Sequence, residues 1–341
     1  MTARWPAEWE RQWGVLLAWP HENSDWAPRL DQARKTFLEI AYHINRFENI
    51  LVIAPEITSV RNELLVAGCS PERTTFIAVP CNDTWARDFG PITVFEKGKA
   101  VLLDFVFNGW GGKFPACLDN QITGQLFEQG CFPDANLEAA DLVLEGGSIE
   151  TDGQGTLLTT SKCLLNPNRN PDLNRKKIES KLSSFLGIKR FLWLHEGFLA
   201  GDDTDAHVDI LARFCNENTI AYTACDDRKD THYQPLKRME KELKDFRKQD
   251  GEPYRLIPLP MPGAQYDEKG ERLAATYANF LIINEAVLAP IYEDENDQKA
   301  LARLAEAFTG REIIGIDCRE LIRQGGSLHC MTMQLPAGLI E

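Results

Sequence analysis

The chain has 341 residues, and its 37 Lys and Arg against 51 Asp and Glu give a formal net charge of −14. Its 43% apolar and 26% charged residues are typical of a globular protein and exclude wholesale disorder. The acidic balance argues against a nucleic acid or an anionic membrane as partner, because both select clustered Lys and Arg. It is compatible with a small cationic substrate.

Strands and helices alternate along the chain according to its apolar patterns. Short runs rich in Val, Ile, Leu, Phe and Thr predict strands over 14–19, 49–54, 74–80, 92–95, 100–106, 141–145, 155–160, 190–194, 207–214, 218–224, 254–259, 276–283, 286–291, 312–317 and 327–335. Apolar residues at helical spacing predict helices over 29–46, 57–67, 119–129, 174–187, 233–249 and 296–308. The sequence therefore indicates the α/β class.

Short turns between two predicted strands recur along the chain and indicate β-hairpins. These turns are Glu96–Lys99, Asp152–Gly155, Asn216–Asn218 and Asn284-Glu285. From one hairpin to the next, the element order is strand, helix, strand and then the first strand of the following hairpin. Residues 14–95 form a looser copy with an additional helix.

Five such units would average about 68 residues each. Regular hairpins at this interval favour a fivefold pseudo-symmetric α/β propeller of ββαβ-type units, closed on itself, over an ordinary doubly wound sheet. The length alone would allow about two or three domains. Five units in one ring instead predict a single domain that covers residues 1–341.

Five segments combine charged or reactive residues with Gly, Trp or Pro beside apolar runs. One residue marks each segment: Asp88, Glu145, His207, Asn279 and Cys330. These markers are separated by 57, 62, 72 and 51 residues, which is close to the length of a unit. Similar places in a ring of similar units converge on its axis, so we expect the five side chains to share one pocket.

The residue types in these segments suit chemistry on a guanidinium group. A cysteine thiolate is a strong nucleophile, and histidine moves protons near neutral pH. Asp88 and Asp209 would repel each other unless a cation lay between them, and a planar guanidinium with its fork of N–H donors fits paired carboxylates best. A carbon held in this way would be open to attack by Cys330.

A series of short motifs extends over essentially the whole chain. They are Pro6–Trp9, Leu17–His21, Trp85–Pro91, Phe107–Gly112, Leu144–Glu150, Asp152-Gly153, Leu157–Thr160, Asn168–Pro171, Gly201–Asp209, Gly270–Ala274, Tyr277–Phe280 and His329-Cys330. Each motif is weak alone, but the ordered set is specific. In this set the chain resembles the family of agmatine deiminases and bacterial peptidylarginine deiminase-like proteins, within the guanidine-modifying pentein superfamily.

The resemblance implies the pentein fold and a hydrolase of linear amidines without metal or organic cofactor. Cys330 would be the nucleophile that attacks the guanidinium carbon. His207 would protonate the leaving ammonia and then activate water, while Asp88 and Asp209 would clamp the guanidinium nitrogens. Glu145 would orient His207 or support the clamp. From agmatine the products would be ammonia and N-carbamoylputrescine, as in polyamine (putrescine) biosynthesis.

Further residues are predicted to bind the substrate. Trp85 and Trp110 would form an aromatic wall beside the cation, with plain core packing as the alternative. Asp203 would meet the distal amine of the substrate, and Asn279 belongs to the same predicted site. His207 and Asp209 are expected on one face of a strand, where they are a structural pair or half of a metal site. The metal reading is disfavoured because no further ligands have the required spacing.

The motifs depart from the family pattern at residues that are expected to line the predicted pocket without touching the catalytic atoms. Ser327-Leu328 precede His329-Cys330 where the family usually has Gly-Asn-Ile, Ala206 stands where it usually has Gly, and Asp205 replaces an Asn. These departures leave the substrate open between agmatine and arginine within peptides or proteins, which would become citrulline. A third reading is an amidinotransferase, which passes the intermediate to an amine. His329 itself is expected to point to the opposite strand face and to be structural.

The nine cysteines form no CxxC pair, which argues against a zinc ribbon or a thioredoxin-type motif. Most are expected to be buried free thiols in a reducing compartment. The N-terminus lacks the apolar region of a signal peptide, and no apolar run is long enough to span a membrane. We therefore expect a cytoplasmic protein without membrane or nucleic-acid partners, and a homo-oligomer is compatible with the sequence.

Overall fold

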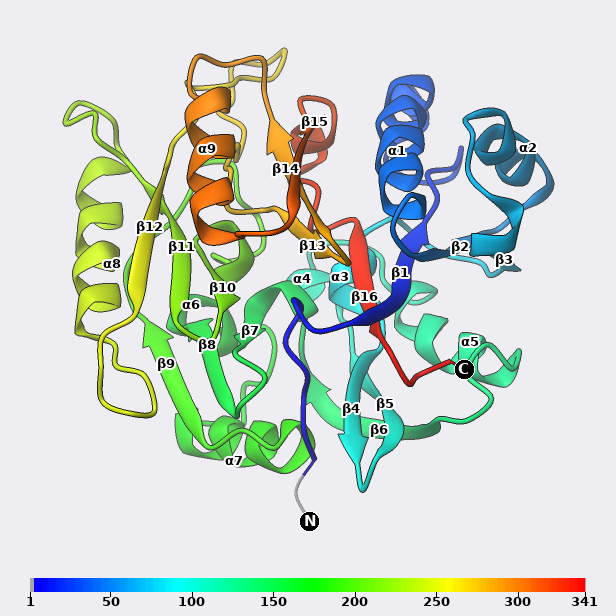
Figure 1. Ribbon diagram of the computed structural model, residues 1–341, viewed down its shortest axis with the longest axis horizontal. Helices are drawn as coiled ribbons and strands as arrows, with labels where there is room; N and C mark the ends of the chain where they lie inside the picture. Colours follow the sequence, from blue (N-terminus) through cyan, green and yellow to red (C-terminus); the bar gives the residue numbers. More distant parts are fainter. Residues whose placement is uncertain (1–2, 341) are drawn as a thin grey trace.

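Five small sheets surround a common centre in the computed structural model, which describes residues 3–340 (Figure 1). Four of these sheets have three strands each. The first two consist of β4 (Ile92–Glu96), β5 (Lys99–Val106) and β6 (Asn136–Val143), and of β7 (Ile149–Thr151), β8 (Thr156–Thr160) and β9 (Arg190–Leu194). The next two consist of β10 (Ala212–Asn216), β11 (Thr219–Ala224) and β12 (Arg255–Pro260), and of β13 (Leu281–Ile283), β14 (Ala286–Ile291) and β15 (Glu312–Asp317). In each, the first two strands pair antiparallel and the last two pair parallel.

The two ends of the described chain build the remaining sheet. Its strands lie in the order β16 (Thr332–Pro336), β1 (Gln12–Ala18), β2 (Asn49–Ala54) and β3 (Thr74–Ala78). β16 pairs antiparallel with β1, and β1 pairs parallel with β2, so the strand order of the other sheets is repeated without a hairpin turn. This explains why the 14–95 copy looked looser in the sequence. The predicted five-unit α/β propeller is confirmed.

Helices cover the periphery of the ring (Figure 1). The longer ones are α1 (Leu30–Asn45), α2 (Thr58–Val66), α5 (Ile122–Glu128), α7 (Arg175–Leu186), α8 (Tyr233–Asp245) and α9 (Asp297–Ala307). Each matches a predicted helix, although α8 ends at Asp245, four residues before the prediction. Its buried residues are Leu236, Met239 and Leu243, so one apolar stripe attaches it to the ring.

Four predicted strands begin too early. The strand expected at 141–145 overlaps the end of β6, whereas the hairpin strand that pairs with β8 is β7 and begins only at Ile149. The strands expected from 207, 276 and 327 begin at Ala212, Leu281 and Thr332. The preceding residues form 3₁₀ turns, such as Gly146–Ser148 and Val208–Ile210, or irregular segments near the axis. Apolar residues in such buried segments have the same composition as a buried strand, so periodicity cannot separate the two.

This correction changes two expectations. Asp209 lies in the 3₁₀ turn Val208–Ile210, so His207 and Asp209 do not share a strand face as the spacing predicted. His329 precedes β16, so the prediction that it points to the opposite face of a strand is also wrong.

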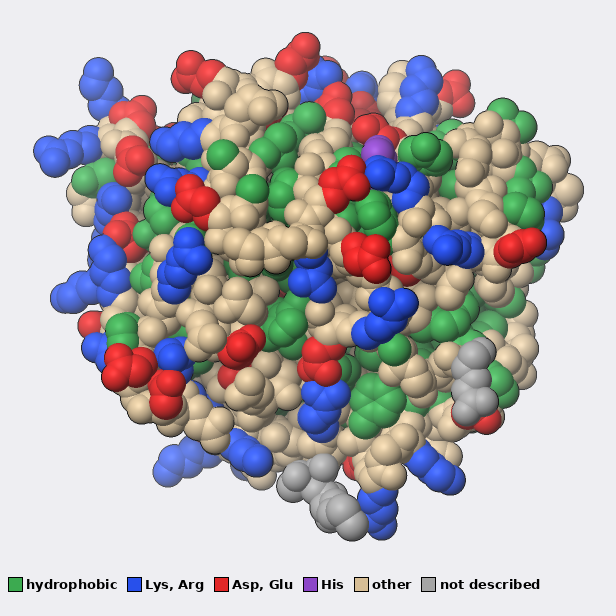
Figure 2. Space-filling view, in the orientation of Figure 1, with side chains coloured by type: hydrophobic (Ala, Val, Ile, Leu, Met, Phe, Trp, Pro, Cys, Tyr) green, Lys and Arg blue, Asp and Glu red, His purple; other side chains and the backbone are tan. Residues whose placement is uncertain are grey.

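The described residues bear on several further expectations. All nine cysteines are free thiols, and all are buried except the exposed Cys117 and the half-buried Cys131, as predicted for most of them. No helix among residues 3–340 is long and apolar enough to cross a membrane. On the face shown in Figure 2, Lys and Arg are interspersed with Asp and Glu. Met1, Thr2 and Glu341, which belong to the predicted domain and N-terminus, lie outside the described residues.

Candidate active site

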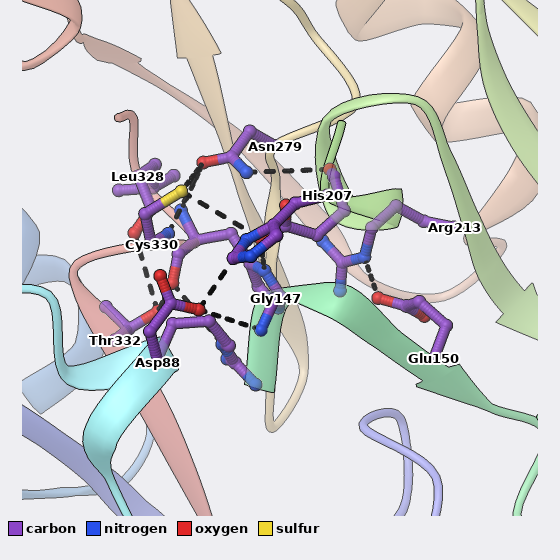
Figure 3. A network of polar contacts seen from close by, with 12 residues as sticks. Asp88, Gly147, Glu150, His207, Arg213, Asn279, Leu328, Cys330 and Thr332 are labelled. Carbon is purple, nitrogen blue, oxygen red and sulfur yellow. Dashed lines mark hydrogen bonds and ion pairs between the residues drawn. The ribbon is translucent and has the colours of Figure 1, made fainter. Parts of the chain in front are cut away.

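The five marker residues lie in segments that lead into the first strand of each sheet. Asp88 is in the short helix α3 (Ala86–Phe89), while Glu145 and His207 directly precede 3₁₀ turns. Asn279 and Cys330 lie shortly before β13 and β16. The segments meet at the centre of the ring, so that Asp88, His207, Asn279 and Cys330 surround one space (Figure 3).

Cys330 is surrounded by oxygen acceptors. Its sulfur lies 3.4 Å from Asn279 Oδ1 and 3.8 Å from Asp209 Oδ2. The same Asn279 oxygen accepts the backbone N–H of His329 at 3.0 Å, which holds the segment that carries the cysteine. Burial, together with the carboxylates of Asp209 and Asp88, raises the pKa of the Cys330 thiol well above its ordinary value. A bound cation would favour the thiolate, since it offsets these negative charges.

Asp88 is oriented by two N–H donors. The indole Nε1 of Trp110 donates to Asp88 Oδ2, and the backbone N–H of Gly147 donates to Asp88 Oδ1, each at 2.9 Å. Burial raises the pKa of Asp88, and the neighbouring His207 opposes that rise. The two bonds fix the carboxylate on both sides, so Trp110 contributes a polar contact in addition to its ring.

His207 is a buried side chain with unused hydrogen-bonding capacity. Its Nδ1 lies 3.7 Å from Asp88 Oδ1 and its Nε2 lies 3.9 Å from Glu145 Oε2, and neither nitrogen has a hydrogen-bond partner among the described residues. Burial alone would lower the pKa of His207, but Asp88 and Glu145 contribute to raising it well above the ordinary value. An imidazole held this way can give a proton to a bound ligand.

Glu145 is fully buried behind His207 and is held by Arg169. The Nε atom of Arg169 lies 2.9 Å from both carboxylate oxygens of Glu145, and its Nη1 lies 2.6 Å from Asp205 Oδ2. Burial would raise the pKa of Glu145, but His207 and Arg169 lower it overall. This arrangement is consistent with the predicted role of Glu145 in orienting His207.

Asp209 is held by His329, the residue next to Cys330. His329 Nδ1 lies 2.8 Å from Asp209 Oδ2, while Asp209 Oδ1 is buried without a hydrogen-bond partner in the described chain. Burial would raise the pKa of Asp209, but the hydrogen bond from His329 keeps it below its ordinary value. One oxygen is therefore anchored, and a buried acceptor remains for a ligand.

A cavity of about 270 Å³ adjoins these residues. Its lining extends from the exposed Asp25 and Glu271 to the buried Asp88 and Cys330, so it connects the surface with the Cys330 side chain. Of the predicted substrate-binding residues, Trp85, Asp88, Trp110 and Asp203 line it. The lining does not include His207, Asp209, Glu145 or Asn279.

The two predicted tryptophans form a wall of this cavity. Their ring centroids lie 6.5 Å apart, with an interplanar angle of 82°. The indole N–H of Trp85 donates to Asp83 Oδ2 at 3.1 Å. A Cβ atom on Gly326 would come within 2.0 Å of the Trp85 ring, so only glycine lets the chain pass against the indole. The wall therefore depends on Gly326 as well as on the rings.

Two groups of buried side chains among the described residues have the spacing of metal ligands. They are Glu145, Cys163 and His207, and Glu8, Glu150 and His329. Each group already contacts an arginine, because Arg169 binds Glu145 and Arg213 binds both Glu8 and Glu150. A guanidinium supplies the positive charge that a cation would bring, so we assign both groups to arginine binding.

Residues 4–336 match the sequence profile of the Porphyromonas-type peptidyl-arginine deiminase family. The chain belongs to this family. One solved structure similar to this chain is a cysteine-to-serine variant of C. jejuni agmatine deiminase with substrate bound. Its sequence is 41% identical to this chain, the TM-score is 0.92, and the match covers 100% of this chain and 98% of that one. A candidate arginine deiminase from Porphyromonas gingivalis is 48% identical over 100% of both chains, with a TM-score of 0.94. A candidate agmatine deiminase of Shewanella sp. (strain MR-7) is 34% identical over 98% of this chain and 94% of the relative.

Two departures from the deiminase family pattern fall at residues with unusual backbone angles. Asp205 and Ala206 have φ angles of 67° and 64°, in the left-handed region that Gly and Asn adopt most easily. The Ala206 N–H donates to Asp202 Oδ2 at 2.7 Å, and the Ala206 carbonyl accepts from Thr160 Oγ1 at 2.7 Å. These bonds hold the loop before His207 in spite of the strain. The expectation that the departures line the pocket is wrong, because the cavity lining includes none of Asp205, Ala206, Ser327 and Leu328.

Several site residues of this deiminase family member were not predicted. Arg169 and Gly147 lie inside the motifs Asn168–Pro171 and Leu144–Glu150, but the sequence does not indicate what they contact. Cys163 donates weakly to Glu145 Oε2 at 3.9 Å, although in the sequence it reads as one of several ordinary thiols. Glu8 belongs to the N-terminal motif and reaches His329 across the ring. No spacing rule connects these pairs, because their contacts depend on how the units pack.

Proposed function

We propose that this chain is an agmatine deiminase, a hydrolase that converts the guanidino group of agmatine to N-carbamoylputrescine and ammonia. The observation that carries the proposal is the acidic lining of the cavity. Asp25, Asp83, Asp203 and Glu271 follow it inward to Asp88 and Cys330. Such a lining suits a dication with an amine at one end and a guanidinium at the other.

In the first half of the proposed reaction, the guanidinium lies between Asp88 and Asp209. Its charge offsets the carboxylates that raise the pKa of Cys330, so the thiolate becomes accessible. The sulfur attacks the guanidinium carbon and forms a C–S bond. One C–N bond then breaks, and His207 gives the departing nitrogen the proton that makes it ammonia. The enzyme is left with a covalent thiouronium on Cys330.

In the second half, water attacks the thiouronium carbon. His207, now neutral, takes one proton from that water, a C–O bond forms, and the C–S bond breaks to release the thiolate. The second proton of the water leaves to the solvent, where it converts the released ammonia to ammonium. The product is a ureido compound, and the histidine regains its charged form. The raised pKa of His207 supports this cycle, because the ring starts as a proton donor. No cofactor takes part in the proposed cycle.

Agmatine is favoured over arginine by the partners of the two arginines that line the cavity. Arg272 Nη2 lies 2.8 Å from Asp230 Oδ2, and Arg323 Nη1 lies 2.5 Å from Glu268 Oε1. Both guanidinium groups are thus already paired, while an α-carboxylate would face the acids of the cavity. Agmatine lacks that carboxylate. The C. jejuni and Shewanella relatives carry the name agmatine deiminase, which supports the same choice.

Ammonia release from agmatine, free arginine and a blocked arginine peptide tests the proposal. We expect kcat/KM for agmatine to exceed the other two by at least about a hundredfold. A preference for the peptide would establish the peptidyl-arginine reading that the family name suggests. If an added amine were converted to a substituted guanidine and no ureido compound formed, the chain would be an amidinotransferase. Activity on none of the three would overturn the deiminase proposal.

The proposal also includes a single-domain organisation, a cytoplasmic location and a role in putrescine biosynthesis. We treat residues 1–341 as one deiminase domain, which is supported by the pairing of β16 with β1 at opposite ends of the chain. A cytoplasmic enzyme of putrescine biosynthesis, with a small guanidino substrate and no nucleic-acid partner, follows from the proposed reaction. Native mass spectrometry would test for a homo-oligomer.

A further inference from the structure

The N-terminal segment sends one carboxylate into the centre of the ring. Glu8 precedes β1 and is buried, with 7% of its surface exposed. Its Oε1 accepts the backbone N–H of Ile282 at 2.7 Å. Its Oε2 accepts from Arg213 Nη2 at 2.6 Å and lies 2.8 Å from His329 Nε2. Glu8 therefore contacts three units of the ring at once, although it lies outside every predicted site.

His329 joins this carboxylate to the active site. Its Nε2 lies 2.8 Å from Glu8 Oε2, and its Nδ1 lies 2.8 Å from Asp209 Oδ2. Ionised carboxylates only accept hydrogen bonds, so both ring nitrogens must donate. The ring between the two acids is then an imidazolium. Removing the charge of either acid would remove the reason for the second proton.

We propose that Glu8 is a positioning residue of the active site, which acts through His329 to keep Asp209 ionised and oriented toward the guanidinium. The inference rests on the proposed function, in which Asp209 clamps the substrate. Its basis is a continuous chain of short contacts from Glu8 to His329 to Asp209. Asp209 in turn lies 3.8 Å from the Cys330 sulfur. The N-terminal Pro6–Trp9 motif thereby gains a role that the catalytic scheme alone does not give it.

The charges around Glu8 support its ionised form. The groups that face Glu8 or His329 are Arg87, Arg213, Arg311, Glu48, Glu150 and Asp209. Burial would raise the pKa of Glu8, but Arg213, His329 and Arg87 keep it well below its ordinary value.

Arg213 would keep two partners if Glu8 lost its charge. These are Glu150, and the backbone carbonyl of Phe280, to which Arg213 Nη1 donates. The fold should therefore tolerate a neutral isostere at position 8.

The substitution Glu8→Gln keeps the shape of the side chain and removes its charge. His329 should then lose its second proton and bind Asp209 as a neutral ring, so the pKa of Asp209 should rise. Because substrate binding needs ionised Asp209, the acid limb of kcat/KM for agmatine should move upward by about one pH unit. Activity on that limb should then fall by about tenfold. A profile that superimposes on the wild-type profile would overturn the inference, whatever the thermal stability.

The matched control is Glu10→Gln, which removes a charge from the same segment at a residue paired with the exposed Arg4. It should leave the pH profile unchanged. If Glu8→Gln does not fold, His329→Gln serves as the second variant, because it leaves Glu8 on Arg213 and Ile282. It should displace the acid limb in the same direction, and an unmoved limb would count against the inference.

Nitrogen-15 NMR of the labelled full chain tests the inference without substrate. His329 is identified by the signal lost in His329→Gln. Because both nitrogens face carboxylate oxygens in the wild type, we expect both to carry protons, and in Glu8→Gln one nitrogen should be bare. A neutral His329 in the wild type would overturn the inference. Because this measurement needs no turnover, it stays decisive even if the chain releases no ammonia from agmatine.

Discussion

The backbone N–H of Gly147 donates to Asp88 Oδ1 at 2.9 Å, directly beside the imidazole of His207. A Cβ atom at this glycine would lie 2.6 Å from His207 Nδ1, 2.9 Å from Asp88 Oδ1 and 3.0 Å from Asp209 Oδ2. The missing side chain therefore leaves a space bordered by the proposed acid/base residue and both proposed clamping carboxylates. Gly147 supplies an orienting bond and keeps this space open.

The substitution Gly147→Ala should abolish most activity without unfolding the protein. Gly147 does not have a positive φ, so alanine can adopt its backbone conformation, and only the space is lost. We expect kcat/KM for agmatine to fall by at least about a hundredfold, since a displacement near 1 Å can cost that much. Steady-state ammonia release measures the effect. Wild-type kinetics in this variant would mean that the guanidinium does not bind here.

The helical glycine Gly124 offers a matched control. The nearest atom to an added Cβ is Asp104 Oδ2 at 3.9 Å, so Gly124→Ala meets no obstacle in α5. This variant should keep full activity and gain about 0.5–1 kcal/mol of stability, because alanine favours a helix.

Cys330→Ala should remove turnover and retain binding of a guanidino ligand. Loss of the nucleophile prevents the C–S bond, whereas Asp88 and Asp209 stay in place, so kcat should fall by at least about a thousandfold. Calorimetric titration with agmatine should still detect binding. The exposed Cys117 provides the control, because Cys117→Ala should leave kcat unchanged. Residual turnover near the wild-type rate would exclude Cys330 as the nucleophile.

Asp88→Asn should have opposite effects on turnover and on thiol reactivity. Asp88 is one of the carboxylates that raise the pKa of Cys330, so its neutral isostere should increase the thiolate fraction of the empty enzyme. Alkylation of Cys330 by iodoacetamide at about pH 8 should accelerate by at least about threefold, while kcat/KM for agmatine should drop. Peptide mass spectrometry follows Cys330, with exposed Cys117 as the internal reference. Slower alkylation would contradict this electrostatic account.

Asp203→Asn tests the contact with the distal amine. Asp203 lines the cavity, and a charge-assisted bond to an amine is worth about 1.5–3 kcal/mol. The KM for agmatine should therefore rise by about tenfold or more, while the KM for butylguanidine, which lacks the amine, should change by less than about twofold. Equal losses with both substrates would show that Asp203 acts on the site in general.

Glu48 should make stability depend on pH. This carboxyl is buried, and burial raises its pKa to about 8 from the ordinary 4.5. The folded state binds the proton more tightly than the unfolded chain, so the free energy of unfolding should decrease as pH rises through the window from 4.5 to about 8.

The variant Glu48→Gln has no carboxyl to ionise at this position, so it should not lose stability in this way as the pH rises. Its stability relative to the wild type should increase between about pH 5 and pH 9, by at most about 4 kcal/mol. Urea unfolding at both pH values measures the difference. A difference that is independent of pH would refute the assignment of this titration to Glu48.

The sequence alone determined the class of fold and the ring of five units. Hairpin turns such as Asn284-Glu285 are local features, and helices such as α8 follow from apolar spacing over a few turns. The markers Asp88, His207 and Cys330 could also be found, because the residue before the first strand of each unit occupies a repeated place. Local patterns and repetition are both visible in one dimension.

Only the tertiary structure decided how the site is held. The start of β10 and the 3₁₀ turn at Asp209 could not be predicted, since burial gives an irregular segment the composition of a strand. Arg169 on Glu145, and Glu8 reaching His329 across 321 residues, are contacts between units. Such pairs form because ring closure brings distant charges into one buried space, where each must find a partner or pay the full cost of desolvation.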